Sequence, residues 1–176
     1  MTSLSELNNN NQTNTLWKDN CILLLNKHID IEIKNFVTYE ALSSLLNNGD
    51  IGLIGLSKKM RKEADEELKH ARDFIDYQNK RGGKVHKINY ESVDISYLEQ
   101  SQHIMIDVYT LILEMEKQTN LSLVCLHNNV EDSALQDLIE TYLHEQHSTQ
   151  KEINDLIMLL KLGGDVYEAI HEKELR

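Results

Sequence analysis

The stretch EELKHARDF, residues 66–74, places a carboxylate and an imidazole among residues that should pack a core. As a helix it puts Glu67 and His70 one turn apart, on the face that also carries Ala71 and Phe74. A buried charge without a partner costs several kcal/mol. The stretch therefore predicts either an exposed pair at a helix boundary or a polar site inside a helical core.

Composition favours one helical domain with cationic partners. The chain has 176 residues, no proline and seven glycines, and because proline breaks helices and glycine weakens them, long helices are expected. Hydrophobic residues make up 40% of the chain, yet no run reaches the roughly 20 apolar residues of a membrane span, so no membrane partner is expected. The formal charge of −11 argues against nucleic acid.

The N-terminal residues predict a flexible arm and a cytoplasmic protein. Residues 1–14 are rich in Asn and are expected to precede a domain that spans residues 15–176. The start of the chain lacks the charged and apolar regions of a secretory signal. Two cysteines, Cys21 and Cys125, are too few for a disulfide framework, so a reducing compartment is expected.

Apolar periodicity predicts four long helices and a short fifth. The long helices cover about residues 15–46, 51–80, 95–127 and 133–162. A glycine-containing loop from residue 81 to 94 is long enough to be a crossover. Gly163 and Gly164 are expected to end the fourth helix, before a short helix at residues 165–175. The predicted fold is an all-α four-helix bundle.

Each inward-facing stripe has a polar interruption near its middle. The interruptions are Glu32, Glu67 with His70, Glu116, and Gln146. Nothing basic lies on these stripes, so a bound cation is the simplest partner. Carboxylates with one imidazole select a first-row ion such as iron, manganese or zinc, and Glu67 could bridge two of them. Tyr39 follows Glu32 by seven residues on the same face, where it is either a neighbour of the site or an ordinary core residue.

Single elements of this pattern have ordinary explanations. Glu-x-x-His is common as an exposed pair, and Glu168 with His171 repeats it in the last helix, where the ordinary explanation is preferred. A lone Glu on a stripe is more often a boundary residue. The coincidence across four helices favours the metal interpretation.

Six segments in order resemble the ferritin family. They are IDIEIKNFVTYE, DEELKHA, NKRGGKV, LEMEKQTNLSL, DLIETYLHEQ and YEAIHEKEL. The resemblance implies a ferritin-like four-helix bundle with one long crossover and a short fifth C-terminal helix. It also implies a heavy-chain type of ferroxidase centre that binds two iron ions. Its implied ligands are Glu32, Glu67, His70 and Glu116, with Gln146 and Tyr39 as catalytic neighbours.

The resemblance extends to other iron sites. Ser148 and Thr149 stand where bacterial-type ferritins carry two glutamates, which leaves Glu66 and Glu145 as a weak third iron site. Asp137 and Glu140 match residues that line the family's three-fold channels, with His127 near the outer mouth. From spacing alone, the preferred explanation is that these two acidic residues stabilise the N-terminus of the helix on which they lie. Leu68 replaces the haem-ligand Met of bacterioferritins, so no haem is expected.

The function that the resemblance implies is iron storage. Fe(II) would be oxidised by dioxygen at the centre within each subunit, and ferric mineral would be stored in a hollow homo-oligomer of 24 subunits with octahedral symmetry. The alternatives are a shell subunit without ferroxidase activity and a helical-bundle interaction protein. Aerobic oxidation of Fe(II) faster than in buffer would separate the first function from both alternatives.

Overall fold

A computed structural model describes residues 19–176, which form four long helices and one short 3-10 helix with no strand among them. The elements are α2 (Asp19–Leu46), α3 (Ile54–Lys80), η1 (Ser96–Gln100), α4 (Ile104–Asn129) and α5 (Ser133–Glu174). The all-α four-helix bundle predicted from periodicity is confirmed. The predicted N-terminal arm, and the first four residues of the predicted first helix, lie outside the described residues.

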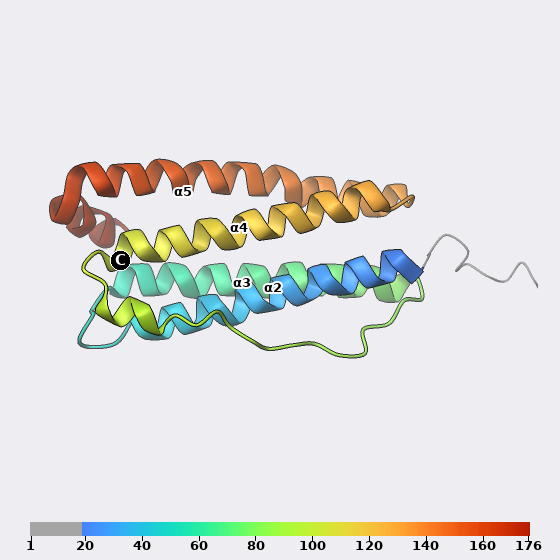
Figure 1. Cartoon of the computed structure of the whole chain (residues 1–176), viewed down its shortest axis with the longest axis horizontal. Helices are drawn as coiled ribbons and strands as arrows, with labels where there is room; N and C mark the ends of the chain where they lie inside the picture. The colour runs from blue at the N-terminus through green and yellow to red at the C-terminus, as the bar shows by residue number, and fades with distance from the viewer. Residues whose placement is uncertain (1–18) are drawn as a thin grey trace, which may run out of the picture.

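The helices pack as two antiparallel pairs, α2 with α3 and α4 with α5 (Figure 1). The colour gradient in Figure 1 shows that α3 and α4 run in the same direction along the bundle. A short turn cannot connect two consecutive helices that run in the same direction, so the chain returns along the whole bundle before α4 begins. This is the long crossover that the sequence predicted.

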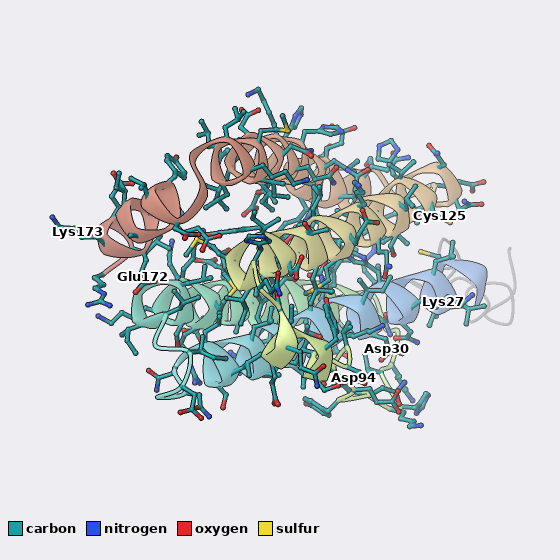
Figure 2. All side chains as sticks on the ribbon, turned by 60° about the vertical axis from the view of Figure 1, so that its left-hand side comes forward. Lys27, Asp30, Asp94, Cys125, Glu172 and Lys173 are labelled. Atoms are coloured by element: carbon teal, nitrogen blue, oxygen red, sulfur yellow. The ribbon has the colours of Figure 1, made fainter. Side chains whose placement is uncertain are left out.

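The crossover lies along α2 and is held there by side chains of that helix. Thr38 Oγ1 accepts a 3.0 Å hydrogen bond from the backbone N–H of Val93, and Asp30 accepts two of 3.4 Å from Asn89. Figure 2 labels Asp30 and Asp94 on this side of the molecule. These contacts satisfy backbone groups that irregular chain would otherwise leave to solvent.

The third long helix begins at Ile104, and its predicted start at residue 95 is wrong. The intervening chain forms η1 and an extended Ser101. Asp94 accepts a 3.0 Å hydrogen bond from the backbone N–H of Ser96, and Ser101 Oγ accepts another of 3.0 Å from that of His103. Short polar side chains that bond the nearby backbone compete with the α-helix, and apolar periodicity does not report that competition.

The other helix boundaries are closer to prediction. The second long helix begins at Ile54 rather than at residue 51, because the turn closes with a 3.1 Å hydrogen bond from Leu53 N–H to the Leu46 carbonyl. At the far end, α5 continues to Glu174, with a kink at Gly164, where φ is 52° and ψ is −149°. Such a left-handed φ favours glycine. The predicted fifth helix is the segment of α5 beyond this kink.

The segment beyond the kink packs against the beginning of α3. Glu172 accepts hydrogen bonds of 2.6 and 2.9 Å from the backbone N–H groups of Gly55 and Leu56. Figure 2 labels Glu172 beside this end of α3. The carboxylate therefore serves two of the N–H groups that a helix N-terminus leaves unpaired.

At the opposite end of the bundle Asp132 links two helices. Its Oδ1 accepts from the backbone N–H of Ala134 at 3.2 Å, so it caps the N-terminus of α5. The same carboxylate accepts a 3.0 Å hydrogen bond from Tyr77 and pairs with Arg81, both near the end of α3. The two ends of the bundle are each closed by a buried carboxylate.

The hydrophobic core is divided into two clusters. One cluster holds Leu42, Met60 and Ile153, and the other holds Leu25, Phe74 and Ile139. The two clusters lie on opposite sides of the level at which the polar interruptions occur along the helices. None of the helices within residues 19–176 has the length and apolar content of a membrane span.

Candidate metal centre

Side chains from all four long helices meet between the two apolar clusters. The carboxylates of Glu32 on α2, Glu67 on α3 and Glu116 on α4 are 2%, 5% and 4% exposed. Gln146 on α5 is 7% exposed. These four residues line one cavity together with His70. The structure thus brings together every residue of the predicted ligand set.

Three of these residues are already arranged as a cation site. Glu32, Glu67 and His70 each offer one ligand atom, and these atoms all lie within 4.8 Å of one another. The Oε2 atoms of both glutamates are buried and accept no hydrogen bond within the described part of the chain. Buried carboxylate oxygens without donors are costly, and a cation would satisfy both. The donor set therefore fits a metal ion.

Glu116 is held in a different way. Its Oε1 accepts a 2.8 Å hydrogen bond from Tyr39, and its Oε2 accepts one of 2.6 Å from Gln146 Nε2. Both oxygens therefore have protein donors, and Glu116 is not part of the preformed cluster. Each oxygen keeps a second lone pair, so a metal could bind Glu116 while these hydrogen bonds hold its carboxylate in place.

The carboxylates of the cavity have divergent proton affinities. Burial, reinforced by the charge of Glu32, raises the pKa of Glu67 well above its usual range. Burial also raises the pKa of Glu116, although the hydrogen bonds from Gln146 and Tyr39 oppose it. Burial opposes ionisation of Glu32, but His28, Glu67 and His70 together outweigh burial and lower the pKa of Glu32. A proton on Glu67 can thus take the place of positive charge, and a cation would displace it.

His70 is oriented by its neighbours on α5 and α2. Its ring lies 4.7 Å from that of Tyr142, whose hydroxyl donates a 2.7 Å hydrogen bond to Asp73. Its Nδ1 lies 3.8 Å from Glu32 Oε2, and its Nε2 lies 4.0 Å from Glu145 Oε2. Burial lowers the pKa of His70. The adjacent Glu32 and Glu145 carboxylates raise it by a larger amount, so the net shift is upward.

A model of the ferritin-like domain family matches residues 22–163. The chain belongs to the ferritin family. It is 31% identical to Ferritin-1, chloroplastic, of Brassica napus over 88% of its length and 63% of that relative's. It is 29% identical to the soma ferritin of Lymnaea stagnalis over 85% of its length and 87% of the relative's. It is also 31% identical to Ferritin-3, chloroplastic, of Glycine max. The chain spans less than two thirds of the length of these two plant ferritins.

The two residues expected for a third iron site in this ferritin lie in different surroundings, because only one of them lines the cavity. Glu145 lines the rim of the cavity and is 54% exposed. Glu66 on α3 is half-buried and is not among the residues that line the cavity. The Glu66–Glu145 site therefore remains a prediction that this arrangement does not strengthen.

The expected channel residues lie on the outside of this ferritin chain. Asp137 and Glu140 are both exposed on the first turns of α5. Glu140 Oε1 is 3.2 Å from His127 Nε2 near the end of α4. The three side chains are thus available to contact other subunits, as a channel would require. His171, in the second Glu-x-x-His pair, instead forms a 2.8 Å hydrogen bond with Tyr109.

Sequence reasoning missed several polar residues that support the site. His28 and Asn35 on α2 are both buried, and Asn35 Nδ2 donates a 2.9 Å hydrogen bond to Thr119 on α4. Gln150 Nε2 donates one of 3.2 Å to the backbone carbonyl of Glu116. The sequence does contain a pattern that could have identified His28 and Asn35. Spacings of four, three and four residues place on one helix face the side chains of His28, Glu32, Asn35 and Tyr39. These polar side chains follow one face of α2.

Proposed function

We propose that this ferritin oxidises Fe(II) with dioxygen and stores the ferric product. The observation that carries the proposal is the pair of buried Oε2 atoms of Glu32 and Glu67, which lack donors and adjoin His70. Removal of such oxygens from water is unfavourable unless a cation binds them. Carboxylates with imidazole suit iron, and the family membership favours iron over manganese or zinc.

Two ions are proposed at unequal positions. Glu32, Glu67 and His70 hold the first, and Glu67 and Glu116 hold the second, so Glu67 bridges both. The second ion has two carboxylates and no imidazole, and Gln146, which lies beside Glu116, is a neutral amide. The second ion is therefore bound more weakly than the first.

Two adjacent ions match the electron requirement of the reaction. Each Fe(II) gives up one electron, and two electrons with two protons reduce dioxygen to hydrogen peroxide. Carboxylate oxygens are hard ligands and stabilise Fe(III) over Fe(II). A weak second position then favours release of the product toward mineral. Iron is a substrate in this scheme, and no haem is proposed, since Leu68 follows Glu67.

Storage requires an enclosed space, and we propose a homo-oligomer of 24 subunits with octahedral symmetry. Large apolar side chains are exposed on α5 on both sides of its kink. They are Met158, Leu159, Leu162, Val166 and Ile170. An apolar surface of this kind marks an interface, and a second copy of the chain is the proposed partner.

Iron is proposed to enter where three subunits meet. Asp137 and Glu140 would then form two carboxylate rings, with His127 at the outer mouth. Their exposure and the His127–Glu140 contact support this assignment. Acidic rings attract divalent cations and reject anions.

The proposed compartment is the cytoplasm. The exposed thiol of Cys125 suits a reducing environment. The plant relatives are named chloroplastic, so a plastid is the second candidate. Immunogold localisation of the native protein would decide between them.

The proposed function is tested by replacing the bridging ligand. Glu67→Ala should remove both iron positions in an anaerobic Fe(II) titration and reduce aerobic oxidation to the rate in buffer. Glu168→Ala, in the other Glu-x-x-His pair, is the matched control and should oxidise like the parent. An assembled parent protein that oxidises Fe(II) no faster than buffer would favour the non-catalytic shell subunit, and a monomeric one would favour the interaction protein.

A further inference from the structure

His28 is fully buried in the bundle next to the candidate metal centre. It lies on α2, one turn before Glu32, and its ring meets that of Phe74 on α3 edge-to-face, with 4.6 Å between centroids. Its Nδ1 is 3.1 Å from the hydroxyl oxygen of Ser122 on α4. Contacts with three helices fix the imidazole, although an apolar side chain would fill the same space at a lower desolvation cost.

The other ring nitrogen approaches a proposed iron ligand. His28 Nε2 is 2.9 Å from Glu32 Oε1, but this contact is not aligned as a hydrogen bond. Glu32 Oε2 faces His70 at 3.8 Å from its Nδ1 and has no donor. The two oxygens of Glu32 therefore differ, because one lies against His28 and the other faces the ion cluster.

The Ser122 contact permits a proton on Nε2 of His28, because a hydroxyl can donate to Nδ1 or accept from it. When the Ser122 hydroxyl donates to Nδ1, the neutral ring carries its proton on Nε2. A buried N–H requires an acceptor, and Glu32 Oε1 is the carboxylate oxygen within reach. A small rotation of the Glu32 carboxylate, of the kind that metal binding imposes, would align the two.

We propose that His28 is a positioning residue that holds Glu32 Oε1 and presents Oε2 alone to the first ion. This inference rests on the proposed metal site, but it concerns the coordination mode of one ligand. Without the donor, Glu32 is free to rotate and bind through both oxygens. Hydrogen-bond partners of metal ligands commonly change metal affinity by about 10–100-fold.

The test uses Co(II) as the probe, with no dioxygen chemistry involved. His28→Leu removes the donor and keeps an apolar side chain, whereas His28→Gln keeps an amide N–H that can reach Glu32. We expect His28→Leu to weaken Co(II) binding at the first position by about tenfold and to change the visible spectrum of the bound ion. His28→Gln should restore both properties. Ser43→Ala is the matched control, since Ser43 is a buried polar residue of α2 that bonds Ser57 about three turns from Glu32.

Ser122→Ala provides a milder variant that does not touch Glu32. It removes the hydroxyl beside Nδ1 and should shift Co(II) affinity in the same direction as His28→Leu, by a smaller factor. Parent-like affinity and spectrum in folded His28→Leu would overturn the proposal, as would a His28→Gln variant as defective as His28→Leu. Failure of the parent itself to bind Co(II) would instead contradict the proposed metal site.

Discussion

Glu116 differs from the other buried carboxylates because both its oxygens already have protein donors. Tyr39 donates from α2 and Gln146 donates from α5, so Glu116 is fixed before any ion arrives. Glu32 and Glu67 each keep one oxygen without a donor. At the scale of single residues, the candidate centre thus combines two carboxylates that each keep a donor-free oxygen with a third that two helices hold in place.

Tyr39→Phe should slow aerobic Fe(II) oxidation while leaving two ions per subunit. The variant keeps the ring but removes the donor to Glu116 Oε1, which costs about 1–3 kcal/mol when an oxygen stays buried and unpaired. It also removes a hydroxyl that lies 2.8 Å from an oxygen of the proposed ligand Glu116. Stopped-flow oxidation with an anaerobic titration measures both quantities. An unchanged initial rate would make Tyr39 an ordinary core residue.

Gln146→Glu should tighten the second ion position and destabilise the metal-free protein. The new carboxylate would lie beside Glu116, where the native amide donates at 2.6 Å, so the two acidic groups would repel each other without a cation. With an ion bound, the additional oxygen becomes a ligand. Anaerobic Fe(II) titration and thermal unfolding with and without Zn(II) would show opposite changes. Equal affinity of the second position in both proteins would contradict the role assigned to Gln146.

Sequence alone could predict that these polar residues meet in the bundle, but not their hydrogen bonds. Helix periodicity and helix lengths together predict that four residues lie at the same height along the bundle, namely Glu32, Glu67, Glu116 and Gln146. The pairing of Glu116 with Tyr39 depends on side-chain rotamers and on the angle between helices, which periodicity does not contain. His28 was missed because it was not counted on a stripe defined by apolar residues.

At the scale of elements, periodicity predicted the long helices because each buries one continuous face. It failed at residues 95–103, where apolar Ile95 and Leu98 continue the pattern although the chain forms a 3-10 turn. Leu98 is fully buried there, so burial does not distinguish the turn from a helix. Hydrogen bonds that the Asp94 and Ser101 side chains accept from nearby backbone N–H groups decide the conformation.

The C-terminal segment should detach from α3 as the pH falls. Burial opposes ionisation of Glu172, but hydrogen bonds from Gly55 and Leu56 and the neighbouring Arg176 together lower its pKa. A carboxyl whose folded pKa is below its unfolded value contributes stability above the unfolded pKa and loses it as pH falls through the folded pKa. Protection of the Gly55 and Leu56 amides in hydrogen exchange should therefore decline in acid.

Glu172→Gln tests the same contact at constant pH. A neutral amide oxygen replaces a charged acceptor whose hydrogen bonds contribute roughly 1.5–3 kcal/mol, so protection of both amides should fall about tenfold at pH 7. Their remaining protection should depend less on pH than in the parent. The exposed Glu174→Gln is the control.

Gly55→Ala should open the contact independently, because its Cβ would lie 2.5 Å from the Glu172 carbonyl oxygen. Parent-like protection in Glu172→Gln would show that another contact holds the segment.

At the scale of the whole molecule, one subunit has surfaces that a monomer does not explain. The apolar side chains around the α5 kink are exposed, with Leu162 at 80% and Val166 at 72%. The chain also carries a formal charge of −11, which repels other copies unless cations or apolar contacts compensate. The apolar surface is consistent with the proposed assembly, and the acidic charge is consistent with cations as its partners.

The double variant Asp137→Ala/Glu140→Ala tests the proposed route of entry. Three copies of each residue would form stacked carboxylate rings that concentrate Fe(II), an effect that salt screens over about 10 Å at 0.1 M. Loss of the rings should slow oxidation by the assembled shell about tenfold at low salt and flatten its salt dependence, while long anaerobic soaks still fill the centre. Asp50→Ala/Glu99→Ala removes the same charge from two exposed residues elsewhere and should behave like the parent. Parent-like oxidation by the Asp137/Glu140 variant at low salt would mean that iron enters by another route.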